Sequence, residues 1–183
     1  METKRNWWGI GWLIAFLGFP PGGALATAII GRLDSAPEGI VGSVAAGIVI
    51  GAAQTLALWR RLPIGPEWAA ATAAGLAVGV SLNVALFGSD TTLNATLLRA
   101  PLTGLMIGIV QWLVLRKHVR YAFWWIPAVT IVYVIAWFVT AQVIRDSLNQ
   151  GFVVFGASGA LVFQALLGVV LTLLLRAGAK AAG

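Results

Sequence analysis

Few side chains in this sequence are of the types that perform catalysis or bind metals. The chain of 183 residues has one histidine, His118, and no cysteine, and none of its six acidic residues falls inside a long apolar stretch. Zinc and haem sites need several histidine, cysteine or carboxylate ligands. Proton-coupled transporters usually place acidic or histidine side chains inside the membrane. The sequence therefore predicts no metal site and no cofactor.

One serine stands in a motif that deserves a test for catalysis. The sequence GASGA at Gly156–Ala160 contains Ser158. It resembles the serine motif of rhomboid intramembrane proteases, in which a histidine on a later helix completes the catalytic dyad. Here only one apolar stretch and a short tail follow the serine, and His118 lies in a basic loop. Because a serine nucleophile needs an activating base within hydrogen-bond reach, we interpret the motif as small-residue packing and predict a protein that is not an enzyme.

Uncharged polar side chains are the better candidates for a site. Gln54 and Gln111 lie a little over one helical turn inside the basic ends of two apolar stretches, and Asn83 lies in a third. Buried amides need partners, and interhelical hydrogen bonds by such side chains contribute about 0.6–2 kcal/mol. Two interpretations follow for the glutamines. They join neighbouring helices, or they line a cytoplasm-facing cavity that binds a polar headgroup or substrate.

Tryptophans recur near the ends of the apolar stretches, among them Trp68 and Trp125, each 14 residues after one of these glutamines. An indole ring is amphipathic and prefers the headgroup region of a bilayer. We therefore interpret these tryptophans mainly as an aromatic belt. The alternative is that they form a platform for a bound ligand.

The elements that carry these residues are predicted to be membrane-spanning helices. The chain is 60% hydrophobic and only 10% charged, whereas soluble domains are about 25% charged. A span needs about 20 mostly apolar residues, and runs of this length satisfy their backbone hydrogen bonds in lipid as helices. Six stretches qualify or nearly qualify: Trp7–Ile30, Gly39–Leu58, Trp68–Phe87, Leu93–Leu115, Tyr121–Ile144 and Gly151–Leu175.

The distribution of charge predicts the orientation in the membrane. If both termini lie on one side, that side has nine of the twelve basic residues, and the other side has only Arg32, Arg99 and Arg145. This bias indicates cytoplasmic termini. Attraction to anionic lipid headgroups is a sufficient role for the basic loops, so we predict contact with the lipid bilayer and no binding of nucleic acid.

An internal repeat organises the six stretches. GAAQTLALWRR begins at Gly51 and GIVQWLVLRKH begins at Gly108, an offset of 57 residues (108 minus 51) that aligns the two glutamines. A weaker copy, GVVLTLLLR, begins at Gly168 and has Leu171 in the glutamine position. Recurrence at a fixed period argues against chance. We predict one transmembrane domain over residues 1–183, built from three tandem helical hairpins (approximately 7–61, 68–118 and 124–176) with approximate threefold symmetry about the membrane normal.

Small residues in the even-numbered stretches predict close helix packing. Gly47 and Gly51 have small-xxx-small spacing, as do Gly104 and Gly108, which lets backbones approach closely. We interpret the second, fourth and sixth stretches as the inner set of helices. The sequence PPGG, formed by Pro20, Pro21, Gly22 and Gly23, predicts a kink or hinge midway along the first helix.

One segment resembles a known group of proteins. The pattern QWLVLRKHVR followed by two tryptophans, within Gly104–Trp125, resembles small polytopic membrane proteins common in cyanobacteria and other bacteria. Their hairpins repeat a GxxxGxxQWLVLRR element followed by a double tryptophan. The resemblance is weaker over Gly47–Trp68 and faint in the final stretch. It implies the repeat architecture and assigns no activity or catalytic residue.

These observations predict an all-α, six-helix protein of the bacterial inner (cytoplasmic) membrane. We expect a non-enzymatic scaffold subunit of a membrane complex, or a protein that binds an apolar ligand such as a lipid, isoprenoid or pigment. The alternative is a small transporter or channel. The candidate binding residues are Gln54, Gln111, Trp68, Trp125 and Asn83.

Overall fold

The computed structural model describes residues 3–31, 36–59, 61–88, 93–145 and 157–180, and the long elements in these ranges are all α-helices. Six helical segments are long and apolar enough to cross a membrane. The prediction of an all-α, multi-pass membrane protein is thus confirmed. The elements are α1 (Thr3–Ile14), a 3-10 turn η1 (Ala15–Gly18), α2 (Phe19–Ile30), α3 (Ala36–Leu58), α4 (Glu67–Phe87), α5 (Leu93–Leu115), a 3-10 turn η2 (Ala122–Trp124), α6 (Trp125–Arg145) and α8 (Ala157–Lys180).

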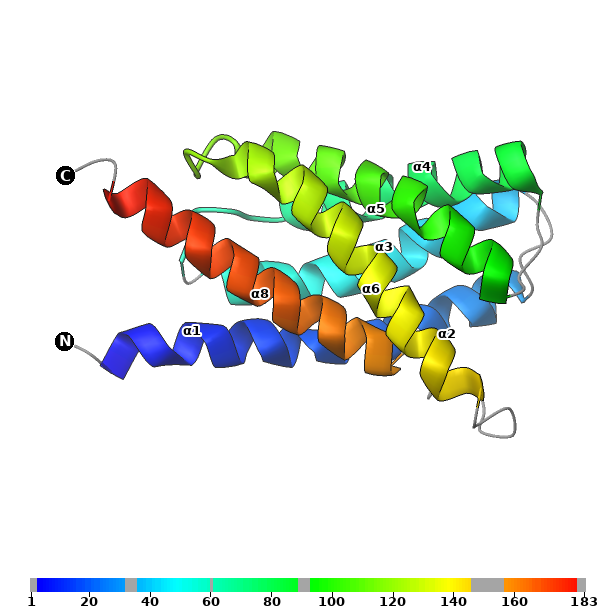
Figure 1. Ribbon diagram of the computed structural model, residues 1–183, viewed down its shortest axis with the longest axis horizontal. Helices are drawn as coiled ribbons and strands as arrows, with labels where there is room; N and C mark the ends of the chain where they lie inside the picture. Colours follow the sequence, from blue (N-terminus) through cyan, green and yellow to red (C-terminus); the bar gives the residue numbers. More distant parts are fainter. Residues whose placement is uncertain (1–2, 32–35, 60, 89–92, 146–156, 181–183) are drawn as a thin grey trace.

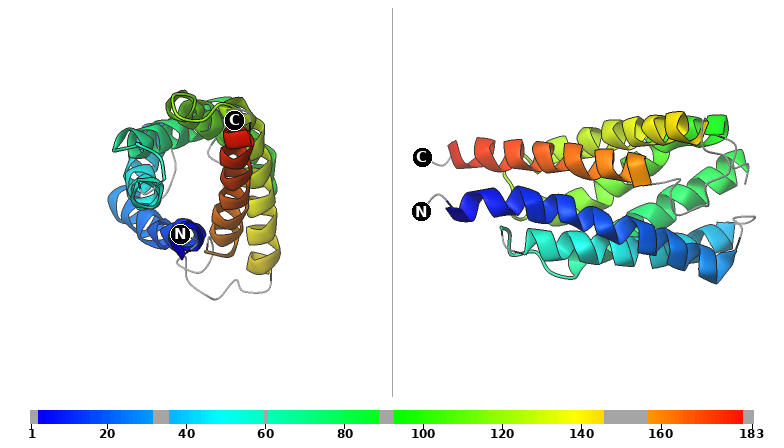
Figure 2. Two further views of the ribbon diagram at one scale, coloured as in Figure 1. Left: turned by 90° about the vertical axis from the view of Figure 1, so that its left-hand side faces the viewer. Right: turned by 90° about the horizontal axis from the view of Figure 1, so that it is seen from below.

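The helices pack in sequence order around one bundle (Figure 1). Each span packs on the next along the chain, and α8 also packs on α1, which closes the series into a ring. Figure 2 shows this ring in the view along the bundle, and its side view places both chain ends at the same end of the molecule. An even number of spans requires this arrangement of the ends.

The first span is interrupted near its middle. The chain leaves α1, passes through the 3-10 turn of Ala15–Gly18 and resumes as α2, where Pro20 and Pro21 occupy the first helical turn. Proline is tolerated at this place because its missing N–H would have no intrahelical partner there. The two glycines that follow, Gly22 and Gly23, have different surroundings. Gly22 is buried against α3, where an added Cβ would lie 3.1 Å from the Ala46 carbonyl oxygen, whereas Gly23 faces open space.

Glycines let successive helices of the ring approach closely. A Cβ on Gly47 would collide with Ala73 of α4, and one on Gly108 would lie 3.0 Å from the carbonyl oxygen of Ile126 in α6. Gly51 and Gly104 are packed in the same way against the helix that follows. The predicted close packing at these glycines is confirmed. In the last span Gly159 packs on the preceding helix instead, since its added Cβ would collide with Thr140 of α6; Gly156 lies outside the described residues.

The even-numbered spans do not form an inner set, and this prediction is wrong. All six spans face one central space, with side chains from each of them lining a common cavity. Gly47 and Gly51 of α3, and Gly104 and Gly108 of α5, face the next helix of the ring. Apolar side chains such as Leu17, Leu98 and Ile131 cover the outside of the ring and are exposed, as expected for helices in contact with lipid.

Candidate functional site

Gln111 is held between two neighbouring helices. Trp125 donates an indole N–H to the Gln111 side-chain oxygen at 3.0 Å, and the Gln111 amide nitrogen donates to the Thr72 hydroxyl at 2.9 Å. The Thr72 hydroxyl in turn donates to the Trp68 carbonyl oxygen. Gln111, Trp125 and Thr72 are all buried. One amide therefore joins α5 to both α4 and α6.

Gln54 repeats this arrangement on the preceding hairpin and extends it across the ring. Trp68 donates its indole N–H to the Gln54 side-chain oxygen at 3.0 Å, the same contact with the same separation of 14 residues. The Gln54 amide nitrogen donates to the side-chain oxygen of Gln164 at 2.9 Å. Because Gln54 belongs to α3 and Gln164 to α8, this bond connects two spans that are not neighbours along the chain.

A third tryptophan closes the network at the seam between the last span and the first. Trp12 donates its indole N–H to the Gln164 backbone oxygen, and the Gln164 amide nitrogen donates to the Trp12 backbone oxygen, both at 2.7 Å. Gly168 makes room for the indole, since a Cβ there would lie 2.5 Å from Cδ1 of Trp12. Three glutamines, three tryptophans and Thr72 thus form one continuous polar network through an apolar bundle.

The interpretation of Trp68 and Trp125 as an aromatic belt is wrong. Both side chains are fully buried (0% exposed), and their rings lie 5.9 Å apart within the bundle. Two other tryptophans, Trp59 and Trp124, are exposed instead. Trp68 and Trp125 are also not among the residues that line the central cavity. They stand behind the glutamines and fix the orientation of the amides.

Sequence alignment of the repeats missed the third glutamine. Leu171, which aligns with Gln54 and Gln111, is buried among apolar side chains, whereas Gln164 lies two helical turns earlier. The signal available in the sequence was an amide near the middle of a long charge-free stretch, where it must find a partner. The alignment of glycines concealed it, because Gly168 does match Gly51 and Gly108.

A cavity of about 190 Å³ lies at the centre of the ring, next to the network. All six spans contribute to its lining. The polar residues are Gln54, Thr72, Gln111, Tyr133 and Thr140, and the remainder are apolar: Phe19, Ile50, Leu76, Ile107, Ala136, Trp137, Gly159, Ala160 and Phe163. A mostly apolar lining with a few polar groups is typical of sites for small molecules. Both interpretations of Gln54 and Gln111 are therefore compatible with one geometry, because each glutamine bonds to its neighbours and also lines the cavity.

A row of aromatic rings forms one side of this cavity. Phe19 and Phe163 meet edge to face at 6.1 Å, Phe163 and Tyr133 do so at 5.8 Å, and Tyr133 and Trp137 at 6.5 Å. These rings come from the first span, α8 and α6, which are consecutive around the ring. The other half of the ring consists of α3, α4 and α5. These helices contribute Gln54, Thr72 and Gln111, respectively. The cavity thus has an aromatic half and an amide half.

Asn83 lies in a separate polar cluster toward the other end of α4. Its amide nitrogen is within hydrogen-bond distance of three acceptors, the closest being the Thr103 hydroxyl at 2.7 Å, with the Gly79 and Arg99 carbonyl oxygens at 3.0 and 3.2 Å. Arg99 donates to the Phe87 carbonyl oxygen at 2.7 Å. Asn83 is buried and does not line the central cavity. The structure therefore gives it a place in helix packing and separates it from the glutamines.

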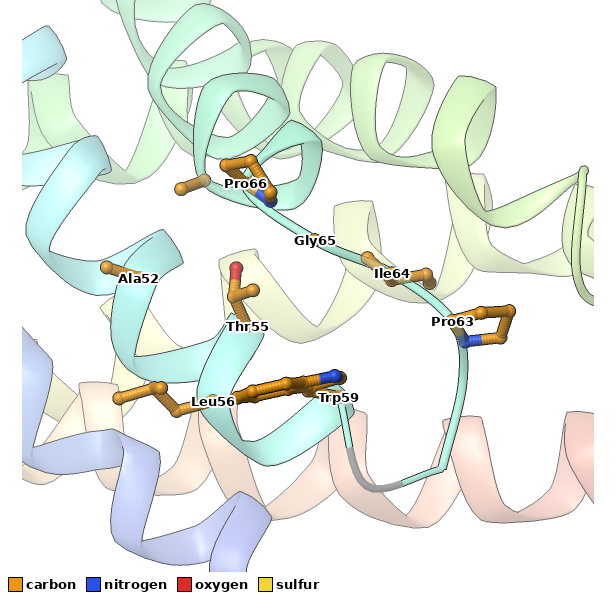
Figure 3. A pocket seen from close by; sticks show the side chains of 9 residues that line it. Ala52, Thr55, Leu56, Trp59, Pro63, Ile64, Gly65 and Pro66 are labelled. Carbon is orange, nitrogen blue, oxygen red and sulfur yellow. The ribbon is translucent and has the colours of Figure 1, made fainter.

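An open apolar groove of about 670 Å³ lies on the outside of the segment that connects α3 to α4. Figure 3 shows Leu56 and Trp59 side by side at the end of α3, with Pro63 and Pro66 in the connecting segment opposite. Leu56 and Trp59 are exposed. This groove has no side chain from the network, so the central cavity, which all six spans line, is the better candidate for a specific site.

The groups that catalysis would use are not brought together in the part of the chain that the structure describes. No group of three or more His, Cys, Asp or Glu residues within reach of one metal ion occurs among those residues. The Ser158 hydroxyl is buried without a hydrogen-bond partner there, so no base contacts it. Pro20 and Gly23 lie beyond Phe19 on α2, and neither lines the cavity.

Compared with protein-family models, with curated proteins and with solved structures, the chain matches none of them. The fold and its apolar outer surface define the class as a multi-pass membrane protein with six helical spans.

Proposed function

We propose that this protein is a non-enzymatic membrane protein that binds an apolar ligand, such as a lipid, isoprenoid or pigment, in the central cavity of its helix ring. The observation that carries the proposal is the cavity itself. It is lined by all six spans and combines an aromatic half with an amide half. A bundle that served only to fill space would gain more from closing this void, because buried cavities destabilise a core.

The size of the cavity limits how such a ligand is held. Sites for whole drug-sized molecules are about 300–1,000 Å³, so 190 Å³ admits only part of a long lipid or pigment.

A scaffold role in a membrane complex belongs to the same proposal, since a ligand or a partner subunit would be recovered with the protein. We place the protein in the bacterial inner membrane, with both termini cytoplasmic and three hairpins related by approximate threefold symmetry. The recurring contact of Trp68 with Gln54 and of Trp125 with Gln111 supports that symmetry.

Native mass spectrometry of gently extracted protein tests the proposal. The expected result is a complex whose mass exceeds that of the chain by a bound apolar molecule or a partner subunit. Recovery of a pure monomer that has neither would contradict it. The added mass should also be lost from a variant with a filled cavity, Ala160→Phe, and kept in the matched variant Ala165→Phe, since Ala165 is exposed on the same helix.

The second candidate function is transport of a small uncharged molecule. The observation that favours it is the break in the first span, because Phe19, the first residue of α2 after the 3-10 turn, lines the cavity. Interrupted membrane helices often accompany transport sites. A transporter must open the cavity to water, so a single cysteine replacing Thr140 should react with a water-soluble, membrane-impermeant thiol reagent from each side in turn. A cysteine that never reacts would exclude transport.

A further inference from the structure

The central cavity contains the features needed to select a particular class of ligand, and the following inference rests on the proposed function. We propose that it binds an uncharged six-membered ring that bears a carbonyl oxygen, either as a free small molecule or as the ring head of a tailed lipid. Size, charge, wall chemistry and hydrogen-bonding capacity each contribute to this assignment.

Volume sets the size of the group. An engineered protein cavity of about 150 Å³ holds one benzene molecule. The cavity of about 190 Å³ therefore admits one six-membered ring with a small substituent. A second ring, or the full length of an acyl chain, would have to lie outside it.

The lining excludes ions. None of the described residues that line the cavity has an ionised side chain at neutral pH. Transfer of an unpaired charge from water into such an environment is very unfavourable. A carboxylate or an ammonium group would find no counter-charge there, so the ligand is neutral.

The aromatic half matches a flat ring. Phe19, Phe163, Tyr133 and Trp137 form a row in which successive rings meet at 70°, 85° and 65°. Such edge-to-face arrangements present both ring edges and ring faces to a neighbour. A further ring gains from stacking or edge-to-face contact with this wall beyond the area that it buries.

The amide half presents hydrogen-bond donors. An indole N–H can only donate, so the bonds from Trp68 and Trp125 occupy the side-chain oxygens of Gln54 and Gln111 and fix which end of each amide is the nitrogen. Each nitrogen has two hydrogens and uses one of them in the network. The second hydrogen on each glutamine is left for an acceptor, and a carbonyl oxygen supplies one without any donor of its own.

Fluorine NMR with four matched probes tests this assignment on the full chain in detergent micelles. The first probe is 4-fluoroacetophenone, which has the ring and the carbonyl oxygen. The second is 1-ethyl-4-fluorobenzene, which has the same carbon skeleton without the oxygen. The third is 4-fluorobenzoate, which is charged, and the fourth is 4-fluorophenyl undecyl ketone, which adds a tail. Partition into micelles is subtracted with a sample of micelles without protein, and Ala165→Phe should behave as the wild type does.

The expected result is saturable binding of 4-fluoroacetophenone that Ala160→Phe abolishes. The ethyl compound should bind about tenfold more weakly, since one hydrogen bond to a buried donor is lost, and the benzoate should not bind. Equal affinity for the ketone and the ethyl compound would overturn the assignment of a carbonyl oxygen. Tighter binding of the tailed ketone identifies a lipid ring head, and equal binding of the short ketone identifies a free small molecule; both support the assignment.

The outcomes also separate this inference from the proposed function. If mass spectrometry recovers an apolar ligand that Ala160→Phe removes, but no ring ketone binds, the inference fails and the proposed function stands. If nothing binds in either experiment, both fail. The double variant Gln54→Met/Gln111→Met provides a second measurement, because the folded protein should lose the preference for the ketone over the ethyl compound while it keeps affinity for the ring. A preference that survives in the double variant would assign the donor elsewhere.

Discussion

Replacement of Gln111 by leucine is the sharpest test of the polar network. The side chain makes two hydrogen bonds, from Trp125 at 3.0 Å and to Thr72 at 2.9 Å, in a place where all three residues are buried. Interhelical hydrogen bonds in membranes contribute about 0.6 kcal/mol on average and up to about 1.7 kcal/mol. The substitution also leaves the indole N–H of Trp125 without a partner, which costs about 1–3 kcal/mol. Thr72 retains its bond to the Trp68 carbonyl oxygen.

We therefore expect Gln111→Leu to lower the free energy of unfolding by about 2 kcal/mol. The assay is a dodecyl sulfate titration of the detergent-solubilised protein, followed by circular dichroism. Trp125→Phe removes the other partner, and the double variant should be more stable than the sum of the two single losses by about 1 kcal/mol, because no orphaned donor is left.

A matched glutamine supplies the control for this measurement. Gln142 lies on α6 with its side chain exposed, so Gln142→Leu should change the free energy of unfolding by less than about 0.5 kcal/mol. If Gln111→Leu is as mild as Gln142→Leu, or if the double-variant coupling is close to zero, the network contributes nothing to stability and the reasoning is refuted.

Three further predictions concern other parts of the ring. Gly168→Ala should lower the thermal midpoint of the solubilised protein, because the added Cβ overlaps the Trp12 indole and overpacking costs about 1–3 kcal/mol; Gly23→Ala, which faces open space, should not. Asn83→Leu should lower the same midpoint without changing ligand binding, because Asn83 bonds α4 to α5 outside the cavity. A cysteine replacing Lys117, in a chain that has no other cysteine, should react with an impermeant thiol reagent only from the cytoplasmic side; labelling from outside would reverse the orientation.

The sequence predicted the ends of these spans closely because charged residues and prolines mark them. The stretches Gly39–Leu58, Trp68–Phe87 and Leu93–Leu115 agree with α3, α4 and α5 to within three residues at each end. Charged or proline-containing segments interrupt the apolar runs there, and the bilayer thickness fixes the length between them. The depth of Gln54 and Gln111 within their spans was equally readable, and a buried amide at that depth requires a partner.

Which side of a helix faces the bundle was not readable in the same way. The spans are apolar on all sides, so periodicity does not separate lipid-facing from buried positions. Trp68 and Trp124 both stand near the start of a helix, yet one is fully buried and the other is exposed. The partner of Gln54 was hidden for a related reason, because the repeat alignment relates successive hairpins, whereas Gln164 meets Gln54 across the ring. Contacts that close a ring have no counterpart in a tandem alignment.

Closure of the ring also explains why the network and the cavity occur together. The bond between Gln54 and Gln164 joins α3 to α8, and the paired bonds between Trp12 and Gln164 join α8 to the first span. In lipid, burial of apolar area gives little drive for helix association, so polar bonds and close packing at glycines must hold the ring. Close packing at these glycines requires small residues where neighbouring helices meet. The large aromatic side chains lie at the centre of the ring, and they fill it incompletely. The amides that hold the ring together therefore also line the cavity. Because the indoles behind them bond to the amide oxygens, the amides present N–H donors to the cavity.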